Sequence, residues 1–84
     1  MTALTPINNA QLLGLIAAGA VDRAHGASIY RLPTCTHPGL ARLRALGLSD
    51  CAVVRRLGQQ WTSYWLTPSG LEAARALAEH PNAA

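Results

Sequence analysis

The fold is decided by one stretch in the second half of the chain, Leu46-Gly47-Leu48-Ser49-Asp50-Cys51-Ala52-Val53-Val54-Arg55-Arg56-Leu57-Gly58-Gln59-Gln60-Trp61-Thr62-Ser63-Tyr64-Trp65-Leu66-Thr67-Pro68-Ser69-Gly70-Leu71-Glu72. Two runs rich in β-branched and aromatic residues, 52–57 and 61–66, flank Gly58-Gln59-Gln60, and this pattern predicts a β-hairpin. Gly47 is a typical helix stop, so we expect a helix to end immediately before the hairpin.

A further helix is expected to follow the hairpin. Thr67 with Pro68 after it predicts an N-cap, and Ser69-Gly70-Leu71-Glu72 offers a capping box as the alternative. Apolar residues then recur at helical spacing, and Pro81 should close the helix. The residues expected to be buried are Leu71, Ala74, Leu77 and Ala78.

Helical periodicity predicts two helices in the first half of the chain. One should begin near Ile7, after Thr5-Pro6, and end at Gly19. The other should begin near Thr36 or His37. The residues expected to be buried are Ala10, Leu12, Leu13, Ile16 and Ala17 in the first helix, and Leu40, Leu43 and Leu46 in the second.

The segment between these two helices has an extended pattern. Residues 27–32 alternate in polarity and predict a short strand that ends at Pro33. Val21 to His25 is compatible with a partner strand or with a loop. We therefore expect an α+β fold in a single domain over residues 1–84, with about 1–5 and 80–84 frayed.

Composition indicates a basic protein with reduced thiols. The 84 residues include seven arginines, no lysine and four acids, for a formal net charge of +3, which suits an anionic partner but is modest for a nucleic-acid binder. Cys35 and Cys51 do not form a disulfide framework. The longest apolar run, 10–21, is too short to cross a bilayer. These features predict a cytoplasmic protein without a membrane partner.

The helix ending in Leu46-Gly47-Leu48, the arginine-bearing hairpin and the helix start Tyr64-Trp65-Leu66-Thr67-Pro68-Ser69-Gly70 together resemble the winged helix-turn-helix proteins of bacteria and their phages. The resemblance covers roughly residues 34–79. It implies a compact winged-helix-like domain with three helices, a short N-terminal strand and a C-terminal hairpin as the wing. The segment 20–33 departs from the family pattern, because it is too short and too extended for the usual second helix.

The resemblance implies that residues 36–48 form the recognition helix and that the hairpin contacts the DNA backbone or minor groove. Ala41 and Ala45 would face outward and contact only thymine methyl groups. The alternative is an ordinary amphipathic helix and hairpin with solvated arginines. The residues that the resemblance assigns to DNA are Thr36, His37, Arg42, Arg44, Arg55, Arg56 and Gln59.

The second hairpin strand suggests an interface. Tyr64 and Leu66 share one face of an alternating strand, and Trp61 and Trp65 share the other. If Tyr64 points inward, both tryptophans point outward, where burial in a homodimer or against a partner protein is expected. The alternative is that one tryptophan folds over the edge of the core.

The remaining reactive side chains do not form a recognisable site. No common zinc-site spacing relates His25, Cys35, His37 and Cys51, so neither a metal nor another cofactor is expected. The four acids are scattered, which argues against catalysis and predicts that the protein is not an enzyme. The favoured hypothesis is a small sequence-specific DNA-binding regulator of a bacterium or mobile element. The alternative is a winged-helix interaction module, such as a phage-encoded inhibitor or adaptor of a host protein.

Overall fold

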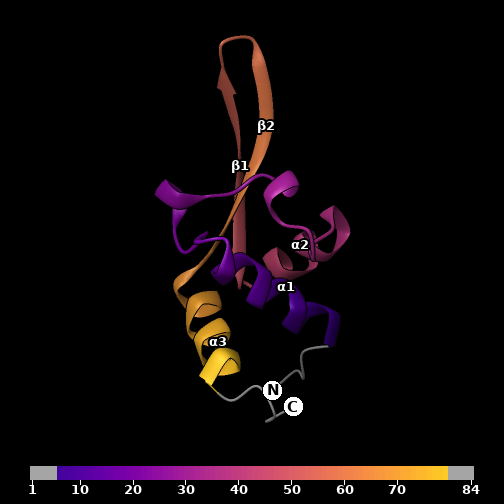
Figure 1. Cartoon of the computed structure of the whole chain (residues 1–84), viewed down its shortest axis with the longest axis vertical. Coiled ribbons are helices and arrows are strands. Elements are labelled where there is room, and N and C mark those ends of the chain that lie inside the picture. The colour runs from indigo at the N-terminus through magenta and orange to yellow at the C-terminus, as the bar shows by residue number, and fades with distance from the viewer. Residues whose placement is uncertain (1–5, 80–84) are drawn as a thin grey trace.

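A computed structural model describes residues 6–79, which form three α-helices and one antiparallel hairpin (Figure 1). The helices form the body of the molecule, and the outer half of the hairpin extends from them as an arm, so the molecule measures 44 × 21 × 20 Å. The order of elements is α1 (Pro6–Ala17), the one-turn 3₁₀ helices η1 (Arg23–His25) and η2 (Ile29–Arg31), α2 (His37–Ala45), β1 (Ser49–Arg56), β2 (Gln59–Leu66) and α3 (Pro68–Glu79). The α+β class is confirmed.

Glycines end the first two helices as expected. Gly19 and Gly47 both have a φ of 76°, in the left-handed region that a glycine adopts without a steric penalty. At the end of α1, Gly19 donates its N–H to the Ile16 carbonyl at 3.1 Å, and Ala20 donates to Leu15 at 3.0 Å. The corresponding pair of bonds follows Gly47 at the end of α2. This Schellman arrangement satisfies carbonyls that would otherwise lack partners.

Thr67, rather than the capping box, starts α3. Its Oγ1 accepts the N–H of Gly70 at 3.1 Å and donates to the Gly47 carbonyl at 2.6 Å. One hydroxyl therefore caps α3 and fixes its start against the end of α2. Pro81 and the termini expected to be frayed lie outside the described residues.

The hydrophobic core lies where the three helices meet the base of the hairpin. The helix of residues 37–45 buries Leu40 and Leu43 as predicted, but Leu46 is exposed because it forms the C-cap. In α3, Ala78 is exposed, contrary to expectation, while Ala74 is buried. The buried apolar residues are Leu12, Leu15, Ala20, Ala27, Leu32, Cys35, Leu40, Leu43, Tyr64, Trp65, Leu66 and Ala74.

The predicted face of α1 is partly wrong. Ala10 and Ala17 are exposed, and the buried side carries Leu12 and Leu15 together with polar Gln11. Gln11 lies inside because it packs against the bare backbone of a glycine in α2, where any Cβ would collide with its amide. A polar residue at a contact between helices is not visible in hydrophobic periodicity.

The hairpin is longer than predicted and its turn is tighter. β1 begins at Ser49 and β2 begins at Gln59, and the register pairs Arg56 with Gln59 across a two-residue turn. The turn residues Leu57 and Gly58 both have positive φ, 50° and 78°. Such a type I′ turn matches the twist of the strands and favours Asn-Gly. Gln59 thus belongs to β2 rather than to the tip.

Leu57 is strained by this turn, because a left-handed conformation costs an L-residue other than glycine about 1–2 kcal/mol. Its side chain is fully exposed and gains nothing from packing. We expect Leu57→Asn to stabilise the protein by about 1 kcal/mol, raising Tm by roughly 4–8 °C in calorimetry. Leu57→Ala keeps the Cβ penalty and should show no such gain. Equal Tm values for Leu57→Asn and the wild type would contradict the turn assignment.

The short strand predicted over residues 27–32 does not form. Ala27 alone bridges to Tyr64, with both backbone hydrogen bonds at 2.8 Å, and the chain then turns into η2. This turn brings Leu32 into the core, where it is almost completely buried. Residues 20–33 therefore form neither a hairpin nor an α-helix but two single turns around one β-bridge.

Candidate nucleic-acid interface

The base of the hairpin is covered on both faces, and the two faces differ in what covers them. The α2 face of the hairpin carries Ser49, Cys51, Val53 and Arg55 from β1 and their partners Leu66, Tyr64, Thr62 and Gln60 from β2. The opposite face carries Asp50, Ala52, Val54 and Arg56 with Trp65, Ser63, Trp61 and Gln59.

Two hydrogen bonds attach α2 to its face of the hairpin. The Ser49 hydroxyl donates to the Leu40 carbonyl at 3.3 Å, and His37 Nδ1 lies 2.6 Å from the Tyr64 hydroxyl. Burial raises the pKa of the Tyr64 hydroxyl, with a smaller contribution from Cys51, so the phenol keeps its proton at neutral pH. His37, which the resemblance assigns to DNA, is thus held toward the hairpin.

Trp65 is part of the core, so its predicted place in an interface is wrong. The side chain is only 8% exposed, with the Arg23 guanidinium 5.8 Å from the ring centroid. Gly26 approaches so closely that an added Cβ would meet Ser63 and Trp65. The segment 20–26 therefore covers the face that alternation assigned to solvent. Trp61, further along the arm, is only partly buried and remains available.

The two α2 arginines lie on different sides of the helix. At about 100° per residue they are separated by roughly 160° around the axis. Arg44 lines a small hollow of about 80 Å³ between α2 and β1, and its Nε lies 3.4 Å from Asp50 Oδ1. Arg42 is exposed and has no ion-pair partner among residues 6–79. Ala41 and Ala45 are exposed as expected.

The hairpin arginines also separate. Arg55 lies opposite Gln60 on the α2 face, whereas Arg56 lies opposite Gln59 on the opposite face. Neither has an ion-pair partner within the described part of the chain. Arg44 and Arg55 therefore share a side with His37, while Arg56 and Gln59 point away from it. Thr36, at the N-cap of α2, is exposed but accepts the Gly39 N–H at 3.1 Å.

The net positive charge of the chain is confined to α2 and the hairpin. Four of the seven arginines and only one acid, Asp50, fall between Thr36 and Leu66. The rest of the chain carries three arginines and three acids, which balance. The arm, which is the part of the hairpin beyond Ala52, carries two arginines and no acid. A polyanion would meet its strongest attraction at α2 and the hairpin.

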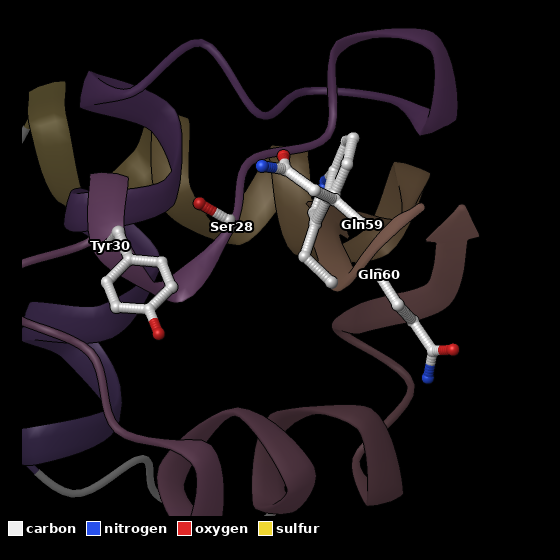
Figure 2. A pocket seen from close by; sticks show the side chains of 5 residues that line it. Ser28, Tyr30, Gln59 and Gln60 are labelled. Atoms are coloured by element: carbon white, nitrogen blue, oxygen red, sulfur yellow. The ribbon is translucent and has the colours of Figure 1, made fainter. Parts of the chain in front are cut away.

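A hollow of about 380 Å³ opens beside the outer half of β2, lined by Ser28, Tyr30, Gln59, Gln60 and Trp61 (Figure 2). Figure 2 shows Tyr30 and Ser28 on one side of it and the two glutamines on the other. A second hollow adjoins it near His37 and Thr62. Tyr30 is 91% exposed, and sequence reasoning missed it because Tyr30 was assigned to a strand. Its position beside Arg31 and three residues before Pro33 was the available signal.

The candidate metal ligands do not meet. Cys35 is buried, donates to the Gln11 carbonyl at 3.7 Å and has its pKa raised by burial. His25 Nδ1 lies 2.6 Å from Asp22 Oδ1, and this hydrogen bond lowers the pKa of the Asp22 carboxyl. Within residues 6–79, no group of three or more His, Cys, Asp or Glu side chains is placed to hold a metal ion.

None of the helices described is both long enough and apolar enough to span a membrane. No family model matches the chain, and no curated protein or solved structure resembles it at a significant level.

Proposed function

We propose that the protein is a small regulator that binds double-stranded DNA through α2 and the α2 face of the hairpin. The observation that supports this proposal most directly is the confinement of the net charge of +3 to residues 36–66. Arginine is well suited to this role because its planar guanidinium forms bidentate contacts with phosphate or guanine.

The arrangement of elements supports a winged-helix version of this proposal. In this version α2 is the recognition helix and the hairpin is the wing. Ala27 takes the place of the short N-terminal strand, since it pairs with the edge of β2. The single turn η2, which precedes α2 after a short loop, takes the place of the missing second helix. The helix-turn-helix would then be reduced to one turn, a connection and α2.

The proposed contacts follow from the side chains that α2 and the hairpin expose. Arg55 and Arg42 would bind phosphates, because neither is neutralised by an acid of the described chain. Arg44 would join them by exchanging Asp50 for a phosphate. Ala41 would contact thymine methyl groups. Base reading by His37 would require the imidazole to leave Tyr64. We therefore assign most of the affinity for DNA to contacts with the phosphate backbone.

The experiment is fluorescence anisotropy with a labelled random duplex at two salt concentrations. We expect a non-specific Kd of about 10⁻⁴–10⁻⁶ M that weakens steeply with salt. Arg55→Ala should weaken binding at low salt and reduce the salt slope by about one. Arg75→Ala is the matched control: it removes the same charge from exposed α3, away from the arm, and should bind as the wild type does. No binding at low salt, or equal losses in both variants, would reject the proposal.

The second candidate is a protein-interaction module, favoured by the apolar side chains of the arm. Val53 is 56% exposed, and Leu57 and Tyr30 are more exposed still. Apolar residues gathered on a projecting element are typical of surfaces that bind other proteins. This candidate would be supported if the wild type does not bind DNA but binds a defined protein partner, and if Leu57→Ser abolishes that binding.

A further inference from the structure

The outer edge of β1 has backbone groups without partners among residues 6–79. In an antiparallel pair, residues alternate between bonding to the partner strand and pointing away from it. Tyr64 and Leu66 use their outward N–H groups to bind Ala27 and Ala20 at 2.8 Å. By the register, the backbone N–H and carbonyl groups of Val53 and Arg55 point away from β2 in the same way. No hydrogen bond is present on the outward backbone groups of these two residues within the described chain.

The lower part of the same edge is blocked by a side chain of its own strand. The Asp50 carboxylate accepts the Cys51 N–H at 2.8 Å. The Cys51 N–H is the next outward-pointing donor toward the base of the hairpin from Val53. A carbonyl of another strand could replace the Asp50 carboxylate as its acceptor. The exposed edge thus runs from Cys51 to Arg55, and its central side chain, Val53, is more than half exposed.

Such an edge is normally protected in proteins by charged side chains, proline, bulges or a covering element. Over residues 51–55, β1 has one charged side chain, Arg55, and neither a proline nor a bulge. A two-stranded hairpin is also marginally stable in water, and the outer half of this one extends beyond the helices (Figure 1). Pairing with further strands would satisfy the edge and stabilise the arm.

We propose that β1 pairs antiparallel with β1 of a second copy of this chain, with Val53 facing Val53 across the two-fold axis. This register places Asp50 opposite Arg56 of the second copy, and the symmetry repeats this ion pair at the other end. The nearest alternative registers that keep outward-pointing backbone groups facing each other move each partner by two residues. Asp50 would then lie opposite Val54 or Gly58 of the second copy instead. Charge complementarity therefore selects the register centred on Val53.

The resulting dimer is a four-stranded sheet with the order β2, β1, β1, β2. To form this ion pair, Asp50 leaves both Arg44 and the Cys51 N–H. The Cys51 N–H then bonds to the carbonyl of Arg55 of the second copy. Arg55 keeps its side chain on the α2 face, whereas Arg56 on the opposite face takes part in the ion pair. The dimer does not depend on DNA binding. Substitution of Arg55 tests DNA binding, whereas substitution of Arg56 tests the dimer.

Sedimentation velocity over a concentration series tests the dimer without DNA. We expect a species of twice the 8.9 kDa chain mass at high concentration. Val53→Pro should abolish it, because the lost N–H points away from β2 and the hairpin keeps all its own bonds. Thr62→Pro is the matched control, since Thr62 pairs with Val53 and lies on the other edge of the hairpin. A protein that stays monomeric at every concentration would overturn the proposal.

Cross-linking tests the register itself and does not depend on proline being tolerated. In a Cys51→Ser background, Val53→Cys should form a disulfide dimer under mild oxidation, because facing residues lie about 5.5 Å apart between Cα atoms. Thr62→Cys should not, because three strand spacings, about 14 Å, would separate the two cysteines. Asp50→Arg or Arg56→Asp alone should weaken the dimer at least tenfold, and the double exchange should restore it. Equal cross-linking of both cysteine variants would reject the pairing.

Discussion

Trp65→Ala is expected to destabilise the protein by about 3–5 kcal/mol, the range measured for removing a large aromatic side chain from a core. The ring is nearly fully buried between the hairpin and the segment 20–26, where Arg23 lies over it and Gly26 has no side chain that would displace it. The loss would be a large part of the 5–15 kcal/mol that holds a typical domain together. Urea unfolding followed by circular dichroism measures it without a tryptophan signal.

Trp61→Ala is the internal comparison. Trp61 lies on the same face of β2, four residues closer to the tip, and is only partly buried. We expect a loss of about 1 kcal/mol, because less apolar area returns to water. If the two substitutions cost the same, segment 20–26 does not cover the base of the hairpin, and both tryptophans belong to one exposed surface.

Gly70→Ala should cost about 2–3 kcal/mol, although alanine is intrinsically the better helix former. Gly70 lies in the first turn of α3, and a Cβ there would run into the carbonyl oxygen of Leu48. That carbonyl also accepts the Thr67 N–H at 3.2 Å, so it cannot move without disturbing the cap of α3. Thermal unfolding should show a Tm lowered by roughly 10 °C or more.

Gly14→Ala provides the matched control within α1. Its Cβ would meet mainly the Thr34 hydroxyl, at the end of an exposed side chain that can rotate away. The gain in helix propensity should offset this contact, leaving the stability within about 0.5 kcal/mol of the wild type. A stable Gly70→Ala protein would show that α3 does not start against the end of α2.

The elements predicted correctly are those whose boundaries depend on local chemistry. Gly19 and Gly47 stop their helices because only glycine adopts the required backbone freely, and Thr67-Pro68 carries its own capping groups. The short strand failed for a different reason. Residues 27–32 have a strand pattern, but the burial of Leu32 and the single bridge at Ala27 depend on elements distant in the sequence.

The candidate site was predictable in composition but not in arrangement. The sequence identifies the arginines, yet Arg55 and Arg56 are separated by the pleat and Arg42 and Arg44 by the helix turn. Trp65 was assigned to the wrong environment because alternation identifies which residues share a face and not what covers that face. Tyr30 and the open edge of β1 become visible only when η2 and the hairpin are placed in space.

The packing of α1 against α3 has a consequence for how the chain folds. These helices lie at opposite ends of the described sequence, so their contact closes the longest loop in the molecule and forms at the greatest entropic cost. The hairpin and α2, by contrast, are joined by near neighbours in sequence. We therefore expect α2, the hairpin and α3 to organise first, and Leu12 and Leu15 to remain solvated during synthesis until α3 has emerged. The apolar side of α1 is thus the part of the nascent chain that most needs protection from premature association.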